Sequence, residues 1–362
     1  MTKMSIYLYV PILKWRMGEY QSLLMMRSDL KPKMLPLIEL CPPEYDFEAE
    51  QLKKTIDEQL ATFAQRLKQK WEDRLAFVDG LLLEASDRMK GGVHPMTFIF
   101  DSVRGKGGGI IPVTGLERDE AYQDAVGAAA KVDGLGVCLR VNLDEVADEA
   151  FEDRIDTLLA SLGVPRAEAD IILDLRAANF EPVAALAALL AGLIENSPVL
   201  ANGRSLTLAG TSFPASMGLI KTRIKEINRS EWLTYKAVCA ALPAAVRRPI
   251  FGDYAIAGPE RVSIDMRLVK PAASVRYASH DIWLVAKGSN VRDNGFEQFR
   301  VLCKELAESK FYLGREFSKG SEHIYDCAFA GASTGNLTTW RWVGTNHHMT
   351  KVLDDLATFA GS

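Results

Sequence analysis

Short strand-like runs alternate with helical patterns along most of the chain, and this alternation constrains the fold more than any other feature. The runs are rich in β-branched and other apolar residues, whereas the segments between them repeat apolar residues every three or four positions. Alternating elements predict a parallel sheet. Eight such units over about 250 residues are typical of a (β/α)8 barrel, and a doubly wound open sheet is the main competitor. The predicted strands are 7–13, 34–40, 74–79, 110–114, 136–142, 169–175, 205–211 and 248–253.

Helices are predicted between these strands, and one segment, 96–103, fits either a strand or a helix. Residues 96–103 have the composition of a strand, yet their apolar positions also fit one face of a helix, and Pro95 suits a first helical position. We interpret this segment as a helix because it restores the alternation. The other predicted helices cover 46–73, 118–131, 143–162, 181–196 and 230–242.

The regular alternation of strands and helices stops after Asp253. Residues at about 260–290 read as a β insertion, and 296–309 form an amphipathic pattern that could be a displaced eighth barrel helix. We therefore predict a barrel over 1–310. The remaining segment, 311–362, is predicted to be an extension that packs on the barrel mouth and closes with a helix at 350–359. About fifty residues are near the lower limit for an independent core.

Composition narrows the possible functions. The net charge of −4 gives no global basic field for nonspecific binding to nucleic acid. No apolar run reaches the roughly 18–20 residues that cross a bilayer, and the N-terminus does not resemble a signal peptide. The five cysteines are scattered and form no CxxC pair, which predicts reduced thiols. We expect a cytoplasmic protein without membrane contact.

Charged residues end several of the predicted strands, where the loops of a barrel build its active sites. The carboxylates Glu39, Asp79, Asp174 and Asp253 could converge on one mouth, where they could bind a divalent metal ion or act as a catalytic acid–base pair. The opposite reading is a structural network in which the charges satisfy one another. The basic side chains at the same strand ends suit a phosphate or carboxylate ligand; these are Lys14, Arg140 and Arg176.

A second constellation lies near the C-terminus. Trp340 and Trp342 flank Arg341, so an aromatic ring could stack a nucleobase while the arginine binds phosphate. A helix starting near Asn346 could offer backbone N–H groups to an anion; alternatively Asn346 caps that helix and the tryptophans pack the tail onto the barrel. We expect 331–348 to cover the barrel mouth, with Arg341 and His347 facing the carboxylates.

Three segments together resemble a known family. The opening YVPILKWRMGEYQSL, the PLIEL of the second strand and TTWRWVGTNHH near the C-terminus resemble the beta family of bacterial and prophage proteins. The resemblance runs the length of the chain. It implies an accessory locus associated with phage defence, in which the founding member acts as an immunity partner that suppresses a neighbouring killer protein. It transfers no catalytic residue to this sequence.

Three functional hypotheses follow. The first is a barrel-based binding module of a phage-defence locus, which restrains or co-acts with an effector (toxin) protein encoded in the same locus. The second is a metal-dependent hydrolase or phosphoesterase acting on a nucleotide or nucleic acid at the mouth. The third is a nucleotide sensor that uses the Trp-Arg-Trp segment. They predict, respectively, a large apolar surface patch, carboxylates at metal-binding distances, and an aromatic pocket beside Arg341.

Overall fold

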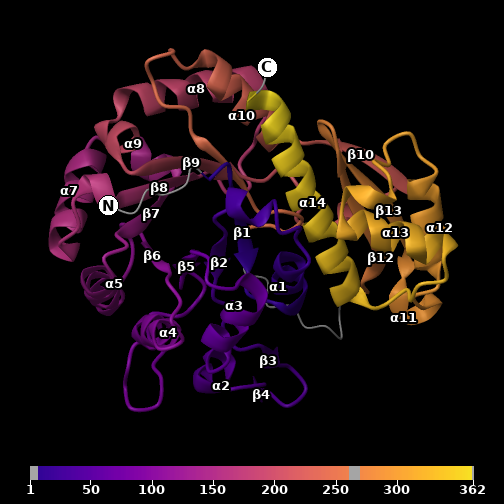
Figure 1. The fold of residues 1–362 in the computed structure, drawn as a ribbon, viewed down its shortest axis with the longest axis horizontal. Helices are drawn as coiled ribbons and strands as arrows, with labels where there is room; N and C mark the ends of the chain where they lie inside the picture. The colour runs from indigo at the N-terminus through magenta and orange to yellow at the C-terminus, as the bar shows by residue number, and fades with distance from the viewer. Residues whose placement is uncertain (1–6, 261–269, 361–362) are drawn as a thin grey trace.

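The computed structural model describes residues 7–260 and 270–360. Eight strands, all parallel to their neighbours, close into one barrel in the order β1-β11-β9-β8-β7-β6-β5-β2 (Figure 1). They coincide with the eight predicted strands, so the predicted (β/α)8 barrel is confirmed. Their bounds are β1 Tyr9–Lys14, β2 Leu37–Glu39, β5 Phe77–Asp79, β6 Ile111–Thr114, β7 Val137–Val141, β8 Ala169–Asp174, β9 Ser205–Gly210 and β11 Ile250–Asp253.

Alternation along each strand separates two apolar layers. Because successive side chains point to opposite faces of a strand, Leu139 of β7 packs outward against the helices, whereas Cys138 packs inside the barrel. Arg140 has the same parity as Cys138 and therefore points into the barrel as well. This parity decides which strand-end residue reaches the interior of the mouth.

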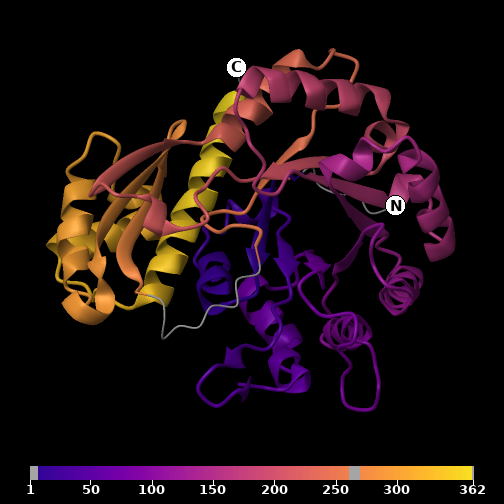
Figure 2. The same ribbon diagram turned by 180° about the vertical axis from the view of Figure 1, so that it is seen from behind.

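Helices surround most of the barrel (Figures 1 and 2). Residues 96–103 lie within α4, which begins at Pro95 with the His94 side chain accepting from the Met96 N–H. The prediction of one helix over 46–73 was wrong, because 45–52 form the short hairpin β3 Tyr45–Asp46 and β4 Gln51–Leu52, and the capping box of Thr55 and Glu58 starts the helix later. The helices are α1 Met17–Leu24, α2 Ile56–Leu60, α3 Phe63–Trp71, α4 Pro95–Arg104, α5 Glu120–Asp133, α6 Leu143–Val146, α7 Phe151–Leu162, α8 Val183–Asn196, α9 Pro198–Asn202 and α10 Ser230–Ala241.

A smaller unit stands beside the barrel. Its antiparallel sheet has the strand order β10-β13-β12, and its apolar core joins β12 and β13 to the helices behind them. β10 comes from the loop after β9, whereas the other elements follow β11, so two barrel loops build this unit. Its elements are β10 Ile224–Asn228, β12 Ala272–Ser279, β13 Ile282–Asn290, α11 Val291–Asn294, α12 Gln298–Ala307 and α13 Lys319–Phe329.

One long helix, α14 Leu337–Ala360, joins the two parts and runs between them (Figure 1). Its first half packs Val343 into the small unit, and its second half packs Leu353 into the barrel core. Phe359 contacts the rings of Trp232 and Tyr235 on α10, while the same helix packs along α1. The eighth barrel helix is therefore α14. The prediction that placed it at 296–309 was wrong, because that segment packs in the small unit as α12.

The tail also differs in detail from its prediction. The closing helix starts at Leu337 rather than at residue 350. The predicted boundary at Lys310, between the barrel and the extension, stays a prediction, because a truncated chain is needed to test it. Within the described residues, no helix combines the length and apolar character needed to span a membrane.

Candidate functional site at the barrel mouth

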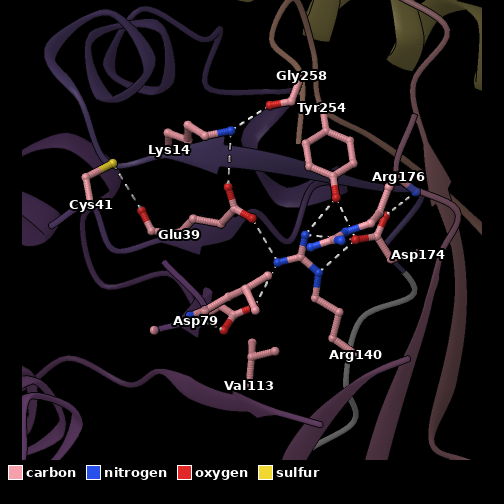
Figure 3. Close-up of polar contacts among 12 residues, drawn as sticks. Lys14, Glu39, Cys41, Asp79, Val113, Arg140, Asp174, Arg176, Tyr254 and Gly258 are labelled. Carbon is pink, nitrogen blue, oxygen red and sulfur yellow. Dashed lines mark hydrogen bonds and ion pairs between the residues drawn. The ribbon is translucent and has the colours of Figure 1, made fainter. Parts of the chain in front are cut away.

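Arg140 occupies the centre of the barrel mouth and binds three carboxylates at once (Figure 3). Its Nη1 donates to Oε1 of Glu39 at 2.9 Å and to Oδ2 of Asp79 at 2.8 Å, and its Nε donates to Oδ2 of Asp174 at 3.0 Å. All four side chains are almost completely buried. β2, β5, β7 and β8 thus each contribute one charged residue of the same inward parity, and the residues form a closed ion network.

Tyr254 completes this network just after β11. Its hydroxyl accepts from Nη2 of Arg140 at 2.7 Å and donates to Oδ2 of Asp174 at 2.5 Å. Burial is the main reason that the pKa of Tyr254 lies well above its ordinary value. Although burial lowers the pKa of Arg140, Tyr254 and the three carboxylates raise it well above its ordinary value. Arg140 is therefore a permanent cation at the centre of the mouth.

Two further cations border the network. Lys14 lies 3.6 Å from Oε2 of Glu39 and donates to the carbonyl of Gly258 at 2.6 Å. Arg118 lies 3.0 Å from Oδ1 of Asp79, which also accepts from the Leu81 backbone N–H at 2.8 Å. Each of the three inward carboxylates therefore has a cationic or hydrogen-bonding partner besides Arg140. The weakest of these contacts is that of Oε2 of Glu39, which has no hydrogen bond and only the 3.6 Å contact with Lys14.

Asp253 does not join the other three carboxylates. It has the outward parity of Phe251, and its Oδ1 accepts from the Tyr9 hydroxyl while its Oδ2 lies 2.5 Å from Nε2 of His348 on α14. Burial raises the pKa of Asp253, but His348, Tyr9 and the Ala255 N–H outweigh it, so the pKa lies below its ordinary value. The expectation of four converging carboxylates was wrong at this position, because parity points the next residue, Tyr254, into the barrel instead.

The histidine and asparagine expected at the mouth lie inside the packing of α14. His347 stacks on Tyr277 with ring centroids 3.6 Å apart, and its Nε2 lies 2.8 Å from the Ala278 carbonyl, so that nitrogen carries the proton. Burial lowers the pKa of His347 to about 3, so the ring is neutral. Asn346 is interior to α14 and its Oδ1 accepts from the Gly320 N–H. It is neither an N-cap nor part of an anion site.

The two tryptophans point away from the barrel mouth. Trp340 is 5% exposed, stacks on Phe299 at 4.3 Å and donates its indole N–H to the Thr334 carbonyl. Trp342 contacts the ring of His323 at the edge of the same small unit. These contacts leave neither ring beside Arg341 as a stacking platform. Arg341 turns the other way, to the barrel side of α14, where its Nε lies 3.7 Å from Oε1 of Glu19.

A family model described as Beta protein matches residues 9–354. The chain belongs to the Beta protein family. This finding agrees with the resemblance noted in the sequence. A search of curated proteins gave no match.

The metal-ion hypothesis for this Beta family chain does not fit its mouth. Glu39, Asp79 and Asp174 direct their oxygens at one guanidinium, and Arg140 occupies the position that a cation shared by them would take. Throughout residues 7–260 and 270–360, no group of three or more His, Cys, Asp and Glu side chains is arranged to hold a metal ion.

The remaining sequence candidate of the Beta family chain, Arg176, lies at the rim. It is exposed, with a positive φ of 54°, and its backbone N–H donates to Oδ1 of Asp174 at 2.9 Å. Sequence reasoning missed Tyr254 and Arg118. The parity of β11 could have identified Tyr254, because Phe251 is the large apolar residue that must pack outward. No local pattern marks Arg118, which reaches the mouth from the loop after β6.

Proposed function

We propose that this chain is a binding module of a phage-defence or immunity locus, which restrains or co-acts with an effector protein encoded in the same locus. The observation that carries the proposal is the Arg140 network. Its carboxylates are buried and bound to one arginine, so they are not free to hold a metal ion or to exchange protons with a substrate. The phage-defence setting comes from the resemblance noted in the sequence, and it is part of the proposal.

An exposed sheet edge supports the binding role. β10 pairs with β13 on one side, and no other strand within the described residues pairs with it. Such an edge presents unpaired backbone groups to which a partner can add a strand. Beside it, Leu219 is 70% exposed and Ile224 is 41% exposed. Apolar side chains next to an open edge support a contact with a protein partner at β10.

Co-expression tests this proposal. Each protein encoded beside the chain in its locus is expressed with and without the full chain, and cell growth is measured. We expect one of these proteins to be toxic and the chain to alter its toxicity. Ile224→Asp should abolish the effect and the co-purification of the two proteins. Leu189→Asp on α8 is the matched control, because Leu189 is 52% exposed and lies away from β10.

Two outcomes would count against the proposal. The first is a chain that still alters the toxicity of its partner fully when it carries Ile224→Asp or Glu226→Pro. That result would place the contact elsewhere or show that no contact is needed. The second is turnover of a nucleotide or nucleic acid that requires a divalent metal and is lost in Asp174→Asn. That result would favour the hydrolase hypothesis.

A further inference from the structure

A basic cleft of about 860 Å³ lies at the barrel mouth, on the far side of Lys14 from Arg140. Its walls come from the loops after β1, β5, β9 and β11, the first turn of α1, the segment from the end of β2 to α3, β12, and the start of α14. Seven basic side chains line it against three acidic ones. The basic ones are Lys14, Arg16, Lys53, Lys54, Arg66, Arg276 and Arg341, and the acidic ones are Glu19, Glu44 and Glu260.

Two arginines in this cleft share a single acceptor. Nη1 of Arg276 donates to the Ile256 carbonyl at 2.8 Å, and Nη1 of Arg341 donates to the same oxygen at 3.3 Å. Burial and the neighbouring charge of Arg341 lower the pKa of Arg276 to about 9. Across the described residues Arg276 has no carboxylate within 4.0 Å, and the nearest acid to Arg341 is Glu19 at 3.7 Å. Two like charges thus face the cleft with little compensation.

The first turn of α1 adds further donors to the same wall. α1 begins at Met17 without a side-chain cap, and Met17 and Gly18 line the cleft. The first N–H groups of a helix have no partner within it and attract anions. Arg341 lies across Gly18, where a Cβ atom would collide with its side chain. The absence of a side chain at Gly18 therefore lets the aliphatic part of the Arg341 side chain pack against the start of the helix.

A buried donor points to the same conclusion. Trp15 lines the cleft and is 8% exposed, yet its indole nitrogen has no hydrogen-bond partner. Buried donors of this kind normally have an acceptor. Beside this buried donor, the wall combines an uncapped helix start with two guanidinium groups, and both features favour an anion.

We infer that this cleft binds a small phosphorylated molecule of nucleotide size, whose phosphate groups contact Arg276, Arg341 and the first turn of α1. Guanidinium groups and helix N-termini both favour phosphate oxygens. The volume lies within the roughly 300–1,000 Å³ of small-molecule sites. Glu19 in the first turn of α1 opposes this ligand and would separate from Arg341 when phosphate binds. The site goes beyond the proposed partner contact, which uses β10.

Calorimetric titration of the full chain tests the inference with pyrophosphate, ATP and adenosine as probes. We expect pyrophosphate and ATP to bind and adenosine not to bind. Arg276→Met and Arg341→Met should each raise the Kd at least about tenfold, since a hydrogen bond to a charged group contributes about 1.5–3 kcal/mol. Gly18→Ala should also weaken binding by displacing Arg341. The matched control is Arg315→Met, because Arg315 pairs with Asp326 and Glu322 outside the cleft.

Circular dichroism and thermal melting establish that each variant is folded before titration. Absence of binding by ATP and pyrophosphate at millimolar concentration would overturn the inference, as would an unchanged Kd in both folded arginine variants. Tight binding of a single-stranded oligonucleotide that ATP fails to displace would assign the cleft to nucleic acid instead. These readouts need no partner protein, so their failure is distinct from failure of the β10 contact.

Discussion

Arg140 and Arg276 are both largely buried arginines at the same end of the molecule, but their surroundings differ. Arg140 lies among three carboxylates and a tyrosine that accept its hydrogen bonds. Arg276 donates to one backbone carbonyl and faces a second arginine. A buried charge is tolerated when partners compensate it. Side chains of the protein itself balance the charge of Arg140, whereas the charge of Arg276 is left available for a ligand.

The largest effect is expected from Arg140→Met. The substitution leaves Glu39, Asp79 and Asp174 buried without their shared cation, and breaking a buried ion pair in this way typically costs about 3–5 kcal/mol. Chemical denaturation at pH 7 measures the loss in the free energy of unfolding. Arg27→Met, which removes an exposed pair with Asp29, is the control and should leave stability nearly unchanged. Near-normal stability of Arg140→Met would mean that water or ions replace the guanidinium easily, and the contrast with Arg276 would disappear.

The next effect, spread over a range of pH, is expected from the neutral ring of His347, which extends the comparison to α14. Its folded pKa of about 3 lies below the ordinary value of 6.5, so the unfolded chain binds more protons between these values. Stability is present above about pH 6.5 and is lost as the pH falls toward 3, with a slope approaching about 1.4 kcal/mol per pH unit. His347→Gln should flatten this part of a stability–pH curve. An equal slope in both proteins would show that other groups control the acid response.

Tyr254→Phe tests the edge of the Arg140 network. Phenylalanine fills the same space but removes the acceptor for Arg140 and the donor to Asp174. We expect a loss of about 1–3 kcal/mol in the free energy of unfolding, the usual cost of leaving buried polar groups unpaired. Tyr325→Phe is the control, since Tyr325 is 37% exposed. A change no larger than that of the control would indicate a hydrated network.

The barrel could be predicted from sequence because its signal is local and repeated. Each strand is a short apolar run, and most of the strands are followed by an amphipathic helix. The small unit lacked such a signal, since β10 lies in the loop after β9 and pairs with β13 more than fifty residues later. The eighth helix was misplaced for the same reason. A sequence pattern identifies α12 and α14 as amphipathic, but only tertiary packing decides which of them covers the barrel.

The candidate site was predictable to the extent that strand ends converge in a barrel. Glu39, Asp79, Arg140 and Asp174 meet, as their positions at strand ends suggested. Asp253 was placed wrongly because a shift of one residue along a strand moves a side chain to the other face. The cleft was missed almost entirely, since Arg276 comes from the small unit and the indole of Trp15 is found unpaired only in three dimensions.

The smallest effect on stability is expected from Arg276→Met, and this variant sharpens the comparison most directly. The substitution removes one hydrogen bond to the Ile256 carbonyl, but it also removes a desolvated charge beside Arg341. These contributions oppose each other, so the free energy of unfolding should change by less than about 1 kcal/mol. The ligand response should change instead. Pyrophosphate binds only the folded cleft and should raise the melting temperature of the natural chain by mass action, whereas the variant should respond much less. A large loss of stability in Arg276→Met without pyrophosphate would show that the protein compensates this arginine internally, as it does Arg140.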